Sequence, residues 1–356
     1  MRNNLFICDN DEKYCLRLYG YLKEKMSMTF DIQGFTDIDE ILQKTEMAKE
    51  AVLVVSENML SNNESAAKIF ELIKNIIILD ENCEMLVEEP GAPYGEETRN
   101  IKHISKYQSC ERIAQSILDM CLKNPDISGK LSFSERSLNI ISFYTPVKTI
   151  YQTDISLLFA ELVSGQMNKD KTLFMTTDCI CPFKDIIARD DEETIADLIY
   201  YAECEKQYLA KFSMYLEKIR KKIGNTYYIP AVKNGKDLRG VKEDSFRGLI
   251  SNIEKCGIYD NLVIDLSEGT DGFLSIVRDS SFHIVLKDSS EYGQRAINAY
   301  KEELKLLDGF DMEKLIEEDI TSINEKLPSK KNEEYTAAKI LSKYKKCTRG
   351  MRTNEK

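Results

Sequence analysis

Acidic residues stand beside two apolar runs, where they could bind a cation. Asp9 and Asp11 follow the run Asn4–Cys8, and Asp265 lies near the end of the run Tyr259–Leu266. If each run forms a strand of a parallel sheet, its carboxyl end lies at the edge where such folds bind ligands. Carboxylates at that edge suit a hard cation such as Mg²⁺. Asp9 and Asp11 could equally form a solvated turn that caps the following helix.

A second candidate is the loop between the apolar run Leu138–Tyr144 and the helical pattern Thr153–Val163. A strand, a tight loop and a helix form a phosphate-binding arrangement in which glycines admit the phosphates and a lysine neutralises their charge. This loop contains no glycine, and its β-branched and aromatic side chains cannot wrap phosphates in the same way. The candidate residues of this loop are Lys148, Thr149, Gln152 and Thr153.

Composition and charge limit other kinds of chemistry. The ten cysteines form no disulfide framework, and the pair Cys179 and Cys181 lacks further ligands nearby for zinc. The net charge of −11 disfavours broad nucleic-acid binding, because an acidic surface repels phosphate. The start of the sequence becomes charged too early for a secretory signal, and no apolar stretch is long enough to span a membrane. We therefore expect a cytoplasmic protein.

The elements that must position these residues follow an alternating pattern. The expected strands of the first part are Asn4–Cys8, Thr29–Phe35, Ala51–Val55, Asn75–Leu79 and Lys102–Ser105. Because helical patterns lie between them, they imply a parallel sheet covered on both faces. The sequence predicts an α/β fold of two doubly wound parallel-sheet domains, at residues 1–122 and 138–310, with a linker at 123–137 and a charged helical or partly disordered tail at 311–356.

Residues 1–122 resemble the receiver domain of response regulators, which has a flavodoxin-like fold. The acidic pair of that family matches at Asp9 and Asp11, and its late lysine matches at Lys106. The resemblance implies a residual cation site at Asp9 and Asp11. Ser56 stands where the family has its phosphoacceptor aspartate, and a hydroxyl lacks the charge that makes the carboxylate nucleophilic. We therefore predict an atypical receiver-like domain that serves protein contacts without phosphotransfer.

The second domain resembles the MinD/ParA group of P-loop NTPases in the order and spacing of its strands. The resemblance places Thr153 at the Mg²⁺-binding threonine, Asp265 at the Walker B carboxylate, and Asp178 near an acidic position after the second strand. Val147 and Gln152 replace two lysines. Each charge-assisted contact is worth about 1.5–3 kcal/mol, so the loss of two predicts a vestigial site with weak binding of ATP and Mg²⁺ at most. Asp265 and Thr153 would then be retained by the fold rather than for catalysis.

A receiver-like module before a MinD/ParA-like domain resembles the CpaE/TadZ family, which is associated with localising Flp-type (Tad) pilus assembly. The resemblance covers roughly residues 4–310. It implies a noncatalytic scaffold or localisation protein that forms a homodimer and binds proteins of a pilus or secretion assembly. Such a protein would reach the cell pole or the membrane through its partners. The alternative is a ParA/MinD-like ATP-dependent switch with an unusual loop, in which Lys148 and Thr153 serve the phosphates.

The end of the chain is basic. Residues Lys339–Arg352 include six lysines and arginines and no acidic residue. A short helix there would place Tyr335, Ala338, Leu341 and Tyr344 along one side. We expect a solvated tail; a contact of these residues with a membrane surface of anionic lipid, or with nucleic acid, is the second interpretation.

Overall fold

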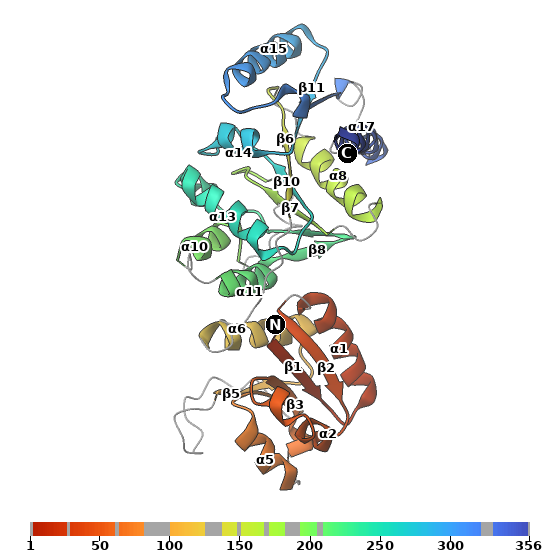
Figure 1. Cartoon of the computed structure of the whole chain (residues 1–356), viewed down its shortest axis with the longest axis vertical. Helices are drawn as coiled ribbons and strands as arrows, with labels where there is room; N and C mark the ends of the chain where they lie inside the picture. The colour runs from red at the N-terminus through yellow and green to blue at the C-terminus, as the bar shows by residue number, and fades with distance from the viewer. Residues whose placement is uncertain are drawn as a thin grey trace. The chain divides into compact units, whose positions relative to one another are not determined.

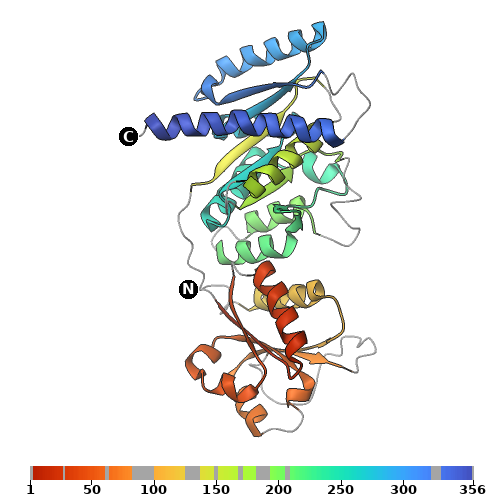
Figure 2. The same cartoon turned by 90° about the vertical axis from the view of Figure 1, so that its right-hand side faces the viewer.

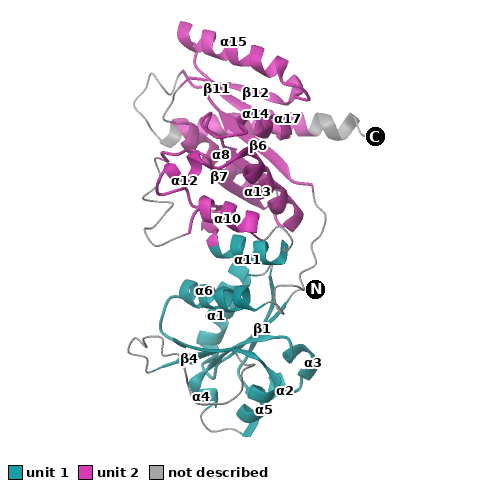
Figure 3. Ribbon diagram, turned by 90° about the vertical axis from the view of Figure 1, so that its left-hand side faces the viewer, with its two compact units in different colours: residues 1–132, 207–218 teal, residues 133–206, 219–356 magenta. Residues whose placement is uncertain are grey.

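The computed structural model describes residues 3–26, 29–60, 64–81, 100–124, 137–147, 151–166, 171–181, 193–204, 209–321 and 330–354. These residues form two compact units, each built on one sheet (Figures 1 and 3). The first unit comprises Met1–Ser132 and Gln207–Lys218, and the second comprises Phe133–Lys206 and Ile219–Lys356. Most of the linker expected at 123–137 lies outside the described residues.

The sheet of the first unit has five parallel strands. They are β1 (Asn3–Cys8), β2 (Phe30–Phe35), β3 (Val52–Ser56), β4 (Asn75–Asp80) and β5 (Asn100–Ser105). Their spatial order is β2-β1-β3-β4-β5, with each neighbouring pair parallel. This is the order of flavodoxin-like doubly wound sheets, so the predicted fold class is confirmed for this unit.

Helices cover both faces of this sheet because side chains alternate along each strand. The helices are α1 (Glu12–Met26), α2 (Ile38–Leu42), α3 (Thr45–Ala48), α4 (Glu57–Leu60), α5 (Glu64–Leu72) and α6 (Cys110–Lys123). Leu5 and Ile7 of β1 pack in one apolar cluster with residues of α1 and α6, whereas Phe6 packs in a second cluster with residues of α2 and α5. Strand burial on both faces explains the continuous apolar runs of the sequence.

The sheet of the second unit has seven strands. They are β6 (Asn139–Tyr144), β7 (Thr172–Thr176), β8 (Lys221–Ile223), β9 (Thr226–Tyr228), β10 (Asn261–Asp265), β11 (Phe282–Lys287) and β12 (Leu315–Asp319). Their order is β12-β11-β6-β10-β7-β9-β8, and β8 alone among them pairs antiparallel to its neighbour. The α/β class is again confirmed, with one short antiparallel edge strand that the sequence did not predict.

The remaining helices come from the second half of the sequence. They are α8 (Gln152–Gln166), α10 (Ile195–Cys204), α11 (Leu209–Ile219), α12 (Lys236–Arg239), α13 (Glu243–Cys256), α14 (Phe273–Asp279), α15 (Glu291–Leu306) and α17 (Lys330–Asn354), with a 3-10 turn at Met312–Lys314. α8 follows β6, as expected for a strand–loop–helix arrangement.

The expectation of a solvated tail is wrong for the part that is described. Strand β12 pairs in parallel with β11, and α17 lies along α8 (Figure 2). The buried face of α17 carries Ala337, Ile340, Leu341 and Tyr344, which join the main apolar cluster of the second unit. The sequence had placed Tyr335 on this face, but its side chain is 73% exposed. Tyr335 and Tyr344 lie on different faces of α17, and the buried face is the one that carries positions 337, 340, 341 and 344.

The basic residues of α17 also have a structural partner. Lys339 and Lys343 lie 2.5 and 2.6 Å from the carboxylate oxygens of Glu318 in β12, which is 1% exposed. The ammonium of Lys343 additionally donates to the backbone carbonyl of Glu317 at 2.5 Å. A buried carboxylate requires such counter-ions. Two lysines of the basic stretch therefore neutralise the carboxylate of Glu318 in the protein's own strand β12. The expected contact with an anionic surface stays a prediction.

Candidate functional site

The strand–loop–helix arrangement places its residues at the carboxyl end of β6. Val147 in the loop is buried, and its backbone carbonyl accepts a hydrogen bond from the hydroxyl of Thr145 at 2.6 Å. The predicted site residues Lys148 and Thr149 lie outside the described residues. Gln152 and Thr153 begin α8, beside the strand that ends in Asp265.

Asp265 is the centre of this site. It ends β10, which lies between β6 and β7, and it is 1% exposed. Its Oδ1 accepts a hydrogen bond from Gln152 Nε2 at 2.7 Å, and its Oδ2 accepts from Thr153 Oγ1 at 2.7 Å. The hydroxyl of Thr176, at the end of β7, donates to the same Oδ2 at 2.8 Å. The structure thus brings together Gln152, Thr153 and Asp265, three of the residues that the sequence singled out.

The donors around Asp265 are all neutral. Burial raises the pKa of the carboxyl group, whereas the hydrogen bonds from Gln152, Thr153 and Thr176 lower it. Within the described part of the chain, Asp265 forms no ion pair. Both carboxylate oxygens accept hydrogen bonds of 2.7–2.8 Å from the described residues around them.

The side-chain amide of Gln152 ties three elements together. Besides Asp265, its Nε2 lies 3.1 Å from the carbonyl of Leu266 and 3.4 Å from that of Phe143. A side-chain amide has two hydrogens for these three acceptors, whereas an ammonium has three. The position is therefore geometrically suited to a lysine, and glutamine fills it without the charge.

Removing the side-chain amide of Gln152 should destabilise the second unit, whereas replacing it with an ammonium group should not. Gln152→Leu leaves Asp265 buried with one donor fewer, and we expect it to lower the free energy of unfolding by about 1–3 kcal/mol. Gln152→Lys should retain or raise that free energy, because the ammonium finds the same acceptors and neutralises the carboxylate. Urea denaturation of both variants measures the difference. Equal stability of Gln152→Leu and the wild type would contradict the assigned role of Gln152.

Asp178 and two threonines complete the surroundings of Asp265. The backbone N–H of Asp178 donates to the hydroxyl of Thr176, and its carboxylate accepts from the N–H of Ile180 in a local turn. Asp178 does not bond to Asp265, although its charge helps to raise the pKa of that residue. Thr177 accepts from the N–H of Ser267 at 2.9 Å. Sequence reasoning missed Thr176 and Thr177, whose only signal was a pair of hydroxyl residues at a strand end.

Asp154 is a further residue that the sequence did not single out. Burial raises the pKa of its carboxyl group to about 6, and the charges of Glu333 in α17 and of Asp265 add to the effect. Burial is the larger cause of this shift.

A histidine with hydroxyl neighbours also lies in this unit, but it serves the core. His283 in β11 is fully buried, with its Nδ1 2.8 Å from Ser142 Oγ and its Nε2 2.8 Å from the hydroxyl of Tyr300. Burial lowers the pKa of His283 to about 3. No substrate can reach Ser142, which is also fully buried, so this group is a satisfied polar network rather than a nucleophilic centre.

In the first unit, Asp9 is paired with a buried lysine. Lys106 Nζ lies 2.9 Å from Asp9 Oδ2 and 2.9 Å from Glu81 Oε1. Burial opposes the charge of Lys106, but hydrogen bonds from its ammonium to Glu81 and Asp9 outweigh it and raise its pKa. The sequence had matched Lys106 by its position; it did not predict Glu81 as a partner. The lysine supplies Asp9 with the positive charge that a bound cation would otherwise provide.

Asp11 and Ser56 have different surroundings. The carboxylate of Asp11 accepts hydrogen bonds from the backbone N–H groups of Lys13 and Tyr14, so it caps the start of α1. Ser56 ends β3 fully buried, and its hydroxyl has no hydrogen-bond partner among the described residues. Those residues also contain no group of three or more His, Cys, Asp or Glu side chains placed to hold a metal ion. The cation site at Asp9 and Asp11 stays a prediction.

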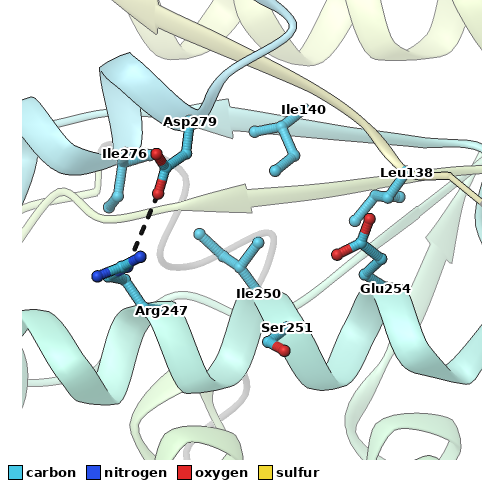
Figure 4. A pocket seen from close by; sticks show the side chains of 8 residues that line it. All are labelled: Leu138, Ile140, Arg247, Ile250, Ser251, Glu254, Ile276 and Asp279. Carbon is cyan, nitrogen blue, oxygen red and sulfur yellow. Dashed lines mark ion pairs between the residues drawn. The ribbon is translucent and has the colours of Figure 1, made fainter. Parts of the chain in front are cut away.

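A separate hollow of about 310 Å³ lies between α13 and the amino end of β6 (Figure 4). Ile250 of α13 and Ile140 of β6 point into it, and Arg247 and Asp279 approach to 3.7 Å at one end (Figure 4). Strand β6 runs from the hollow towards Tyr144, so Gln152 and Asp265 lie at the opposite end of this strand. The hollow is distinct from the candidate nucleotide site.

Comparison with known proteins gives no family assignment. Neither the protein-family models nor the curated proteins match the sequence. Among the described residues, no helix is both long and apolar enough to cross a membrane.

Solved structures resemble part of the chain. A ParA family ATPase from Chlorobium tepidum TLS is 12% identical over 51% of this chain and 73% of its own, with a TM-score of 0.42. Cobyrinic acid a,c-diamide synthase from Mycobacterium smegmatis, with bound ATP analog and magnesium, is 10% identical over 59% and 96% of the two chains, with a TM-score of 0.40. The MinC:MinD cell division complex of Aquifex aeolicus is 14% identical over 51% and 67%, with a TM-score of 0.35.

These scores are too low to carry an argument about this protein. The fold class accordingly follows from strand order: two α/β units with mostly parallel sheets, the second with a strand–loop–helix arrangement next to a strand-end aspartate.

Proposed function

We propose that this protein is a noncatalytic scaffold or localisation factor whose second unit is a P-loop-like domain with a vestigial nucleotide site. The observation that carries the proposal is that the carboxylate of Asp265 is hydrogen-bonded to side chains of its own unit. Gln152, Thr153 and Thr176 use both of its carboxylate oxygens at 2.7–2.8 Å. A carboxylate that must hold Mg²⁺ through a nucleotide cycle needs ligand positions that are free or easily vacated.

The first unit supports the same proposal. Its strand order and the pairing of Lys106 with Asp9 are compatible with a receiver-like domain, and Ser56 supplies a hydroxyl in place of a phosphoacceptor. Without a carboxylate at that position the unit cannot form an aspartyl phosphate there. A unit that keeps its fold without this chemistry is suited to protein contacts.

The proposed setting is the assembly of a Tad-type pilus or a related secretion system, as the resemblance to CpaE/TadZ implies. In this setting the chain would form a homodimer and bind proteins of that assembly. It would be a cytoplasmic protein that reaches the pole or the membrane through these partners.

Calorimetric titration with ATP and Mg²⁺ tests the noncatalytic proposal. We expect little heat of binding and no phosphate release from the wild type. Gln152→Lys is the matched variant, because it restores one cation, and we expect its affinity for ATP to exceed that of the wild type by about tenfold or more. ATP turnover by the wild type that is abolished in Asp265→Ala would refute a noncatalytic function.

A second candidate is an ATP-dependent switch of the ParA/MinD type. The observation that favours it is the placement of Thr153 at the start of α8, within hydrogen-bonding distance of Asp265, where a Mg²⁺-binding threonine would stand. This function requires Lys148 to serve the phosphates. A monomer–dimer transition on addition of ATP, lost in Lys148→Ala and seen by light scattering, would favour the switch; the same mass with and without ATP would favour the scaffold.

A further inference from the structure

The hollow between α13 and β6 has an apolar lining that the packing of the second unit leaves open. Its volume is about 310 Å³, and its apolar residues are Leu138 and Ile140 of the segment that enters β6, Ile250 of α13 and Ile276 of α14. Figure 4 shows Ile140 and Ile250 pointing into the hollow. Ile140 is partly exposed although β6 is an inner strand of the sheet. This volume and this lining are within the range of small-ligand sites.

One face of α13 gives the hollow most of its polar groups. Arg247, Ile250, Ser251 and Glu254 all line it, and they are spaced i, i+3, i+4 and i+7 along the helix. A helix rises about 1.5 Å per residue, so Arg247 and Glu254 are about 10 Å apart along its axis. Figure 4 shows Arg247 at one end of the hollow and Glu254 at the other. The apolar lining therefore lies between a cation and an anion.

The guanidinium of Arg247 is only loosely paired. Its Nε lies 3.7 Å from Asp279 Oδ2, which is too far for a hydrogen bond, whereas Arg278 Nε donates to Asp279 Oδ1 at 3.0 Å. Arg247 forms no hydrogen bond with another residue in the described part of the chain. A guanidinium presents five N–H donors in a planar fork that matches a carboxylate. Arg247 therefore has donors left for the carboxylate of a ligand.

Glu254 is the complementary group at the other end of the hollow. Its side chain is exposed and forms no ion pair or hydrogen bond with a described residue. A carboxylate accepts hydrogen bonds and donates none, so it suits the ammonium group of a ligand. Among the residues that line the hollow, Ser251 supplies the only side-chain polar group between the two charged ends. The middle of the hollow therefore suits an uncharged, mostly apolar body.

We propose that this hollow binds a small linear zwitterion, with its carboxylate at Arg247, its ammonium group at Glu254 and its apolar chain over Ile140 and Ile250. The separation of the two side chains selects ligands whose charged ends are about 10 Å apart. Straight-chain amino carboxylates have this chemistry. Short apolar peptides with free termini have it too, because an extended chain advances about 3.3–3.6 Å per residue.

This site goes beyond the proposed scaffold function. It lies at the end of β6 opposite to Gln152 and Asp265, and none of the residues that line it bonds to that pair. The proposal therefore stands or falls independently of whether the candidate nucleotide site binds ATP.

Methyl NMR of the full chain, labelled at its isoleucine δ1 methyl groups, tests the proposal. Titration with ω-aminooctanoate should shift the signals of Ile140, Ile250 and Ile276. The expected Kd is in the millimolar range, because the ligand has only about eleven non-hydrogen atoms. Ile155 of α8 is fully buried and does not line the hollow, so its methyl signal is the reference.

Three further probes isolate the recognition of the two end groups. Octanoate and octylamine keep the apolar chain and lose one end group each, whereas γ-aminobutyrate keeps both end groups on a chain too short to span the hollow. Each should bind about threefold more weakly than ω-aminooctanoate, or weaker still, because an exposed ion pair contributes little. Equal affinity for octanoate and ω-aminooctanoate would overturn the proposal.

Matched variants test each end of the hollow separately. Arg247→Gln should weaken binding of ω-aminooctanoate and octanoate by about threefold without weakening octylamine, and Glu254→Gln should weaken ω-aminooctanoate and octylamine without weakening octanoate. Both side chains are exposed, so the fold should be retained. Ile140→Phe fills the hollow and should abolish the shifts of Ile250 and Ile276 with every probe.

The tripeptide Ala-Leu-Ala with free termini distinguishes the two sources of this chemistry. Tighter binding than that of ω-aminooctanoate identifies a peptide ligand, and weaker binding identifies an amino carboxylate. If ω-aminooctanoate shifts the signals of Ile140 and Ile250 no more than that of Ile155, the hollow is not its site. If Arg247→Gln and Glu254→Gln both bind it as the wild type does, the charged ends are not recognised, and the proposal fails.

Discussion

Lys106→Met is expected to lower the free energy of opening of the first unit by about 3–5 kcal/mol, because it leaves a buried carboxylate without its counter-ion. The side chains of Lys106 and Asp9 are 5% and 0% exposed, so water cannot replace the ammonium. The substitution also releases Glu81, whereas the backbone carbonyl at position 106 can still accept the hydrogen bond from the hydroxyl of Tyr14. Hydrogen exchange of amides in β1 and β5 measures the loss.

An exposed ion pair on the same unit provides the control for Lys106→Met. Lys49 and Glu46 lie 2.8 Å apart with side chains 54% and 87% exposed, so Lys49→Met should cost less than about 1 kcal/mol. Combining Lys106→Met with Asp9→Leu removes the orphaned charge and should recover part of the stability. Equal effects of Lys106→Met and Lys49→Met would show that the buried pair does not hold the first unit together.

Tyr344→Ala is expected to destabilise the second unit by about 3–5 kcal/mol, as truncation of a large buried aromatic residue does elsewhere. Tyr344 is 1% exposed, and its ring contacts those of Phe159 in α8 and Phe282 in β11, with centroids 5.8 and 5.0 Å away. It therefore joins α17 to the helix and the sheet beside the candidate nucleotide site. Urea denaturation monitored by circular dichroism measures the change.

The same helix contains the matched control. Tyr335 is 73% exposed, and Tyr335→Ala should alter the free energy of unfolding by no more than about 0.5 kcal/mol. If α17 were the solvated tail that composition suggests, both tyrosine variants would behave alike. A large loss confined to Tyr344→Ala would instead place α17 in the structural core of this unit.

Two lysines of the basic end already have a partner within the second unit. Lys339 and Lys343 neutralise Glu318, and the apolar face of α17 is buried on α8. Binding to an anionic surface through these lysines would compete with a buried carboxylate for its counter-ions. Salt-dependent interactions of this protein are therefore expected to affect the stability of β12 as well.

The sequence by itself determined the class of the fold and the strand ends that carry Asp9 and Asp265. Uninterrupted apolar runs such as Val52–Val55 can be satisfied only between two layers of helices, which predicts a doubly wound parallel sheet. The same logic placed Asp9 and Asp265 at strand ends, and the resemblance to the MinD/ParA group implied that Gln152 and Thr153 share a site with Asp265. Local pattern suffices for these features because strand burial and helix starts leave a direct signature in consecutive residues.

Only the tertiary structure decided which partners those residues have. Thr176 reaches Asp265, and Glu81 reaches Lys106, through strands that are neighbours in space but not in sequence. The sequence also could not choose between the faces of α17, nor assign α11 to the first unit, because amphipathic helices show that a face is buried without showing what covers it. Asp9 and Asp265, first singled out as cation ligands, are bonded to the protein's own side chains, since a buried carboxylate is stable only where such donors surround it.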